Sequence, residues 1–213
     1  IAVLAVDPTR RRGGGALLGD RIRMNALDPA QIYMRSLATR SAATEVPPAM
    51  DDIVLATKAA GYDLVIVETP GIGQGDSAIV ELADLSLYVM TPDFGAASQL
   101  EKIDMLDFAD VVAINKFERR GAPDARRDVA RQLLRNREDF AATPEDMPVF
   151  GTVAARFNDD GVTALYQHLR GLLAGRGLEL SGGTLAPVDT KVSTRLAEVV
   201  PAARVRYLAE VAS

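Results

Sequence analysis

Glu68 stands at the end of an apolar run and directly before a glycine-rich segment, where nucleotide hydrolases place a metal-facing acid. The run is Leu64-Val65-Ile66-Val67, and Gly71, Gly73 and Gly75 follow it. Four apolar residues in succession suit a strand of a parallel sheet that is covered on both faces. Ligands bind beyond the carboxyl ends of such strands. The stretch therefore fits either a nucleotide-hydrolysis switch or a core strand with an incidental Glu and an ordinary turn.

A second polar group, Asn115-Lys116-Phe117-Glu118, follows the apolar residues 111–114. GTP-binding proteins place Asn-Lys-x-Asp at such a point, where the carboxylate accepts both N–H donors of guanine. Glu118 carries the same two oxygens one methylene further from the backbone. Asn-Lys pairs are common in loops, but at the end of a strand downstream of Glu68 the tetrapeptide indicates a guanine site.

Composition excludes several classes of function. The chain has 213 residues, of which 48% are hydrophobic and 25% charged, as in ordinary soluble proteins. It has no cysteine, which excludes disulfides and thiol chemistry, and a single histidine, His168, which excludes a His-rich metal site. The net charge of −5 argues against a nucleic-acid surface. No membrane span and no signal peptide are recognisable, so the cytoplasm is the expected location.

Apolar runs alternate with helical patterns along the chain. Strands are expected at residues 1–6, 64–68, 84–91, 110–114 and 148–153, and helices at 20–27, 49–60, 99–108, 123–139, 161–174 and 192–212, with 35–48 irregular. Asp7-Pro8 is expected to end the first strand, because proline lacks a ladder donor. The alternation predicts an α/β fold with a mainly parallel sheet flanked by helices. Residues 181–189 interrupt the pattern and are interpreted as a linker.

Three segments, AVDPTRRRGGGALLGDRIRM, VETPGIGQGD and INKFE, resemble the metallochaperone-type GTPases that serve adenosylcobalamin-dependent acyl-CoA mutases. The segment SLYVMTPDFGAASQLEKIDMLDFADVVAINKFERRGA favours the fused isobutyryl-CoA mutases, in which the chaperone lies inside the mutase polypeptide. The resemblance runs from Ile1 to about Phe157. It implies a partial P-loop GTPase domain over residues 1–180 and a linker toward a mutase domain over 181–213.

The resemblance also implies a magnesium site. Asp7, Asp20 and Glu68 match acids around the Mg²⁺ ion, and Val6, through its carbonyl, and Thr69 match positions beside it. Because Mg²⁺ keeps several waters, some of these groups are expected to act through water. Without the resemblance, Asp7 could be a turn residue and Asp20 a helix N-cap.

Other positions match groups that contact the nucleotide. Arg23 would share a helix face with Asp20, and its planar guanidinium suits phosphate. Gln74 could orient the attacking water. Lys102 belongs to a segment, residues 92–102, that responds to nucleotide and contacts the mutase in the family, although a solvated lysine fits equally well.

On the same ground, Asn115, Lys116, Phe117 and Glu118 match the guanine pocket. Thr152 to Ala155 should line the base from the other side.

The phosphate-binding motif G-x-x-x-x-G-K-[ST] does not occur in the sequence. The family carries it one helix before the strand that opens this chain. We therefore expect a piece of a longer polypeptide that is inactive alone.

The expected function is GTP hydrolysis with Mg²⁺, which gates adenosylcobalamin loading or protection in a mutase that interconverts isobutyryl-CoA and n-butyryl-CoA. The expected partners are the mutase and cobalamin-binding domains and a second copy in a homodimer. The alternatives are a free-standing chaperone of methylmalonyl-CoA mutase and a nucleotide-binding regulatory module without significant hydrolysis.

Overall fold

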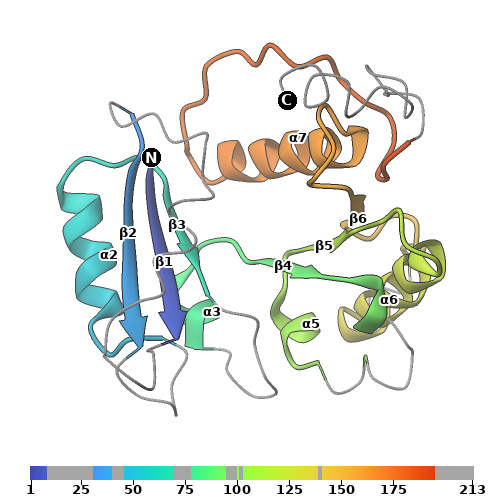
Figure 1. Ribbon diagram of the computed structural model, residues 1–213, viewed down its shortest axis with the longest axis horizontal. Helices are drawn as coiled ribbons and strands as arrows, with labels where there is room; N and C mark the ends of the chain where they lie inside the picture. The colour runs from blue at the N-terminus through green and yellow to red at the C-terminus, as the bar shows by residue number, and fades with distance from the viewer. Residues whose placement is uncertain are drawn as a thin grey trace, which may run out of the picture. The chain divides into compact units, whose positions relative to one another are not determined.

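The chain forms two compact units, Ile1–Leu85 and Ser86–Ser213 (Figure 1). The computed structural model describes residues 1–8, 31–39, 46–69, 78–94, 100, 103–138 and 141–194. Each unit contains a three-stranded sheet in which all the pairings are parallel. The predicted α/β class with parallel sheets flanked by helices is confirmed.

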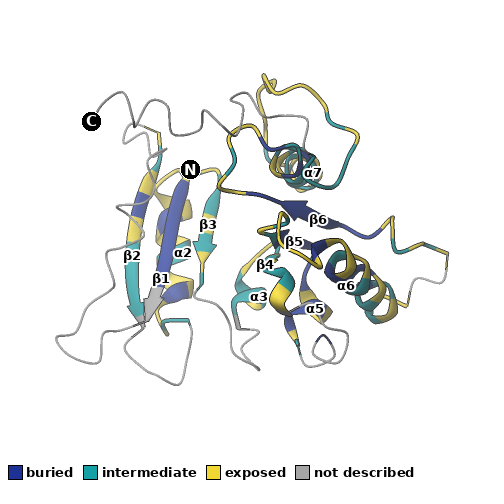
Figure 2. Cartoon of the chain, turned by 45° about the vertical axis from the view of Figure 1, so that its right-hand side comes forward, coloured by how far each residue is buried: buried dark blue, intermediate teal, exposed yellow. Residues whose placement is uncertain are grey.

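The first unit is built around β1, the central strand of the order β2-β1-β3. The strands are β1 (Ala2–Pro8), β2 (Tyr33–Thr39) and β3 (Val65–Glu68), and the helices are α2 (Met50–Ala59) and α3 (Ala78–Leu82). Leu4, Val6 and Met50 form a core between the sheet and α2. Figure 2 shows β1 buried along most of its length, so the first apolar run of the sequence holds this unit together.

Three predictions for this unit need correction. Residues 35–48 were expected to be irregular, but β2 covers Tyr33–Thr39. It forms because its backbone pairs with β1, although Met34 is the only buried residue among those of 33–38. The first strand also continues through Asp7 to Pro8, since a proline at the last strand position has no further ladder bond to donate. The strand at 64–68 is present as β3, but it is not buried on both faces, because it is the outer described strand and leaves Ile66 45% exposed.

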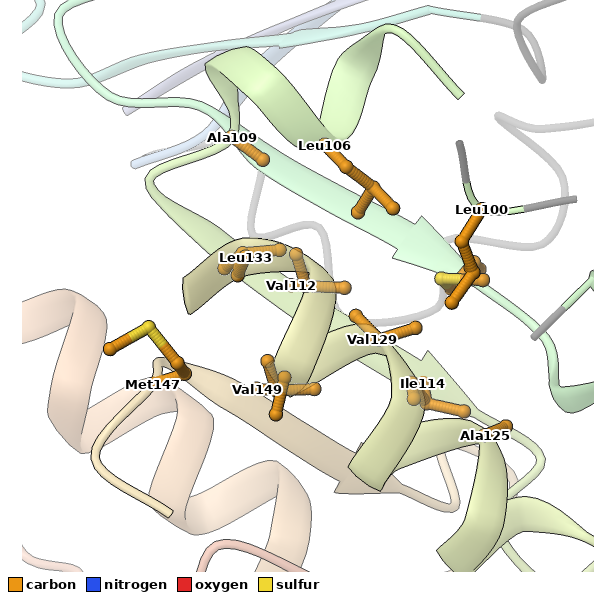
Figure 3. Close-up of a cluster of buried hydrophobic side chains, with 12 residues drawn as sticks. Leu100, Leu106, Ala109, Val112, Ile114, Ala125, Val129, Leu133, Met147 and Val149 are labelled. Atoms are coloured by element: carbon orange, nitrogen blue, oxygen red, sulfur yellow. The ribbon is translucent and has the colours of Figure 1, made fainter. Parts of the chain in front are cut away.

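The second unit has the strand order β4-β5-β6. Its elements are β4 (Leu87–Met90), η1 (Pro92–Phe94), α5 (Met105–Phe108), β5 (Val111–Asn115), α6 (Ala122–Asn136), β6 (Val149–Thr152) and α7 (Asp160–Gly175). On one face of the sheet, α5 and α6 pack against β5 and β6 through the apolar cluster of Figure 3. On the other face, Ala164 of α7 packs with Val111 and Phe150. Because both faces of β5 are covered, its first four residues are all buried.

Residues 190–194, which we call the strap, lie along the outer edge of β6. Val192 forms a parallel bridge with Gly151, and the Ser193 N–H donates to the Gly151 carbonyl at 2.8 Å. A helix was expected from residue 192, but the described part, up to Thr194, is extended. Its backbone donors and acceptors pair with the edge of β6 instead of closing a helical turn.

Candidate nucleotide-binding site

The acidic group of the first unit lies at the carboxyl ends of β1 and β3. In the parallel register, Glu68 of β3 lies beside Ala5 of β1. Val6 and Asp7 follow Ala5 in β1, and Thr69 follows Glu68 at the end of β3. Val6 is buried, and Glu68 is exposed. Both ends therefore open on the same sheet edge, which is where α/β sheets bind ligands.

The structure shows where the backbone of Val6, Asp7, Glu68 and Thr69 lies, but the assignment of these residues as magnesium ligands stays a prediction. The side chain of Asp7 and the whole of Asp20, Arg23, Gln74 and Lys102 lie outside the described residues. In the part of the chain that the structure describes, no three His, Cys, Asp or Glu residues come together in a way that could hold a metal ion.

Asn115 joins the end of β5 to the loop that follows β6. Its Oδ1 accepts a hydrogen bond from the Ala154 N–H at 3.1 Å and another from the Thr152 hydroxyl at 3.4 Å. Asn115 and Thr152 are also register partners in the β5–β6 ladder. The structure therefore places Thr152 and Ala154 beside Asn115, and the expectation that residues 152–155 line the base stays a prediction.

Lys116 turns the chain sharply after β5. Its φ of 58° lies in the left-handed region, which is uncommon for a residue with a Cβ atom. The turn lets the Phe117 N–H donate to the Thr152 carbonyl at 3.0 Å and leaves Glu118 exposed. Backbone outliers of this kind are often held in place at binding sites.

Phe117, the third residue of the Asn115 tetrapeptide, packs against β6 and the apolar cluster. Its ring packs on the backbone of Gly151, where an added Cβ atom would overlap the ring, and it also contacts the apolar cluster beneath β5. The structure thus shows a packing role for Phe117, and its match to the guanine pocket stays a prediction. The sequence alone did not reveal this, because Phe117 and Gly151 are far apart in the chain.

Asp159 is the polar residue that sequence reasoning missed. It caps the N-terminus of α7, and only 2% of it is exposed. Its Oδ2 accepts hydrogen bonds from the Val162 N–H at 3.0 Å and from the Val153 N–H at 3.3 Å. The Asp-Asp-Gly sequence in front of a helical pattern was the available signal, since Asp is a favoured N-cap.

A shallow depression of about 530 Å³ lies at the opposite end of the β5–β6 sheet. Asp110 and Pro148, which precede β5 and β6, line it together with Arg137 and His168. Burial, and then the nearby Lys191 ammonium, hold the pKa of His168 below its ordinary value of 6.5. The depression is remote from Asn115 and takes no part in the candidate site.

Comparisons with known proteins show which proteins this chain is similar to. The family model of the methylmalonyl Co-A mutase-associated GTPase MeaB matches residues 1–178. The chain is 72% identical over 212 residues to the fused isobutyryl-CoA mutase of Nocardia farcinica, and 65% identical over 212 residues to that of Cupriavidus metallidurans. These matches cover 100% of this chain but only 20% and 19% of the two relatives, so the chain spans about one fifth of their length.

Among solved structures, LAO/AO transport system kinase aligns with 83% of this chain and 51% of its own, at 23% identity and a TM-score of 0.49. Within the described residues, no helix combines the length and the apolar character that crossing a membrane requires.

Proposed function

This chain belongs to the family of the methylmalonyl Co-A mutase-associated GTPase MeaB, and we propose that it is the GTP-binding and GTP-hydrolysing domain of an adenosylcobalamin-dependent acyl-CoA mutase. The observation that carries the proposal is the Asn115 junction, which holds the loop after β6 against the end of β5. That junction forms the floor on which a guanine base would rest. Identity of 72% to a fused mutase over the whole chain supports the same assignment.

Glu118 is proposed to select guanine. The exposed side chain follows the sharp turn at Lys116, and its two carboxylate oxygens suit the two adjacent N–H donors of guanine. Adenine offers no such pair of donors on that edge. Charge-assisted hydrogen bonds of this type are the strong ones, so the carboxylate favours guanine over adenine.

Glu68, Asp7, Asp20, Thr69 and the Val6 carbonyl are proposed to surround Mg²⁺. They supply oxygen atoms only, which is the donor set that Mg²⁺ prefers, and the β1–β3 register brings four of them to one sheet edge. When bound, the ion would neutralise phosphate charge. Arg23 is proposed to contact a phosphate, Gln74 to orient the attacking water, and Lys102 to lie in the segment that responds to nucleotide.

Exposed apolar side chains on an outer described strand of each sheet support the proposal that a phosphate-binding segment lies elsewhere in the longer polypeptide. Parallel sheets are normally covered on both faces, yet Leu87 and Val89 of β4 are 39% and 56% exposed, and Ile66 of β3 is 45% exposed. The motif G-x-x-x-x-G-K-[ST] is absent from this sequence. A strand, phosphate loop and helix supplied by the longer polypeptide would complete the GTPase domain that residues 1–180 contribute to.

The longer polypeptide is proposed to interconvert isobutyryl-CoA and n-butyryl-CoA. GTP hydrolysis would gate the loading or protection of adenosylcobalamin, and residues 181–213 would lead toward the mutase domain. We expect a homodimer that works in the cytoplasm, where GTP and acyl-CoA substrates are found. Two relatives are named fused isobutyryl-CoA mutases and contain a segment that matches this whole chain, which supports the assignment.

The test is GTP turnover by the full-length polypeptide, with the Glu68→Ala variant as its control. We expect magnesium-dependent turnover that falls by at least tenfold in the variant, since metal-bound groups contribute several kcal/mol to phosphoryl transfer. Turnover no higher than that of the variant would overturn the assignment as a GTPase. Tight GTP binding without turnover would instead favour a regulatory module.

A further inference from the structure

We propose that Asp159 and Ser193 are positioning residues for residues 152–155, the loop after β6 that we call the guanine-binding loop. The strap would then form part of the nucleotide site. The inference rests on the proposed guanine-binding function. It adds Ser193, from after α7, and Asp159, the N-cap of α7, which belong to neither the Asn115 tetrapeptide nor residues 152–155. Hydrogen bonds at Ser193 and Asp159, together with the backbone of residues 153–154, link the strap to Asn115.

The strap is fixed to β6 through its backbone. The Gly151 N–H donates to the Lys191 carbonyl at 2.9 Å, and the Ser193 N–H donates to the Gly151 carbonyl at 2.8 Å. Lys191 adds a second anchor, because its ammonium lies within 3.2 Å of the carbonyl oxygens of residues 145–147. Gly151 directly precedes Thr152, so the strap is attached next to the residue that bonds Asn115.

Ser193 connects the strap to a buried carboxylate. Its hydroxyl lies 2.7 Å from Asp159 Oδ2 and 3.1 Å from the Gly151 carbonyl. A hydroxyl carries one hydrogen, and hydrogen bonds to charged acceptors are the stronger ones, so the favoured acceptor is Asp159. Oδ1 of Asp159 is buried without a hydrogen-bond partner among the described residues. The orientation of this carboxylate therefore depends on the few donors around Oδ2.

Asp159 in turn accepts a hydrogen bond from the guanine-binding loop. The Val153 N–H donates to the same Oδ2 at 3.3 Å. Val153 lies between Thr152 and Ala154, whose hydroxyl and N–H both donate to Asn115 Oδ1. A carboxylate that turns away from Val153 would release the centre of this loop.

Close backbone packing makes the arrangement stiff. A Cβ atom at Gly161, in the first turn of α7, would overlap the Gly151 carbonyl and the backbone of Ser193. Two further bonds fix the end of the strap: the Thr194 hydroxyl donates to Asp160, and the Arg156 guanidinium donates to the Thr194 carbonyl at 2.9 Å. Because coupling is reciprocal, a guanine nucleotide that orders the loop should also hold the strap in place.

The experiment compares Ser193→Ala with Ser193→Thr in the full-length polypeptide. Titration with a fluorescent GDP analogue measures affinity, and steady-state GTP hydrolysis gives kcat and KM. Loss of one charge-assisted hydrogen bond beside the loop should weaken GDP binding and raise KM about three- to tenfold, with kcat unchanged. Thr keeps the hydroxyl and should restore both values. Asp159→Asn, which leaves an acceptor for the helix cap but removes the charge, should shift KM in the same direction.

Ser181→Ala is the matched control, because Ser181 is exposed in the same C-terminal segment but lies outside the strap. The inference is wrong if Ser193→Ala leaves GDP affinity and KM at the control values. It is also wrong if only kcat falls while KM is constant, since that result reports a smaller active fraction. Failure of the unsubstituted protein to bind GDP would overturn the proposed function itself.

Discussion

Two glycines of α7, Gly161 and Gly171, should respond in opposite directions to the same substitution. An added Cβ atom at Gly161 would overlap two backbone groups, the Gly151 carbonyl and the Ser193 N–H, whereas at Gly171 nothing lies within 4 Å. Backbone groups cannot rotate away as a flexible side chain can. The comparison therefore isolates the packing of the strap against β6 and α7.

The expected magnitudes follow from these contacts. In a helix, Ala is favoured over Gly by about 0.8–1 kcal/mol, so Gly171→Ala should stabilise the protein by up to that amount. Forcing an extra methyl group into a packed site costs about 1–3 kcal/mol or more. Because the overlap at Gly161 is with backbone on two elements, we expect Gly161→Ala to lower the free energy of unfolding by roughly 2 kcal/mol.

The assay is urea unfolding of the full-length polypeptide followed by circular dichroism, combined with hydrogen exchange at the strap amides. Gly161→Ala should unfold at lower urea and should exchange faster at Ser193 and Gly151, whose backbone groups pair across the strap. Gly171→Ala should leave these amides as protected as in the unsubstituted protein. Equal stability of the two variants, or unchanged protection at Ser193, would refute the reasoning.

Three further outcomes are expected. Leu133→Ala removes a fully buried side chain from the cluster of Figure 3 and should cost about 2–5 kcal/mol of stability in urea unfolding, whereas Leu180→Ala, at a 39% exposed position, should cost much less. The lowered pKa of His168 means that the unfolded chain binds its proton more strongly, so stability should be complete above about pH 6.5 and fall as the pH drops below it. His168→Gln should reduce this dependence of stability on pH. An unchanged pH dependence would contradict its attribution to His168. Glu118→Gln should weaken GDP binding at least tenfold in a fluorescence titration. Because the side chain is exposed, the unfolding midpoint should stay within a degree or two. Unaltered GDP affinity would rule out a role of Glu118 in base recognition.

The sequence by itself determined the elements that carry a local signal. The continuous apolar residues 111–114 predict β5, and helical spacing predicts α6, in which Val129 and Leu133 are buried. Periodicity and propensity act between neighbours in the chain, so such elements can be read without tertiary information. The same holds for the Asn115 tetrapeptide, because its place after an apolar run marks it as a strand-end group.

Only the tertiary structure decided the features that join distant segments. β2 has no apolar pattern of its own and exists because its backbone pairs with β1. The contacts of Asn115 with Ala154 and of Ser193 with Asp159 span 39 and 34 residues, and no local preference specifies them. The Ser193–Asp159 contact forms because a buried carboxylate favours nearby donors, and the packed chain supplies them from segments distant in the sequence. The sequence alone pointed to the Asn115 tetrapeptide, whereas packing around β6 brought the strap and the buried carboxylate of Asp159 to the loop that follows β6.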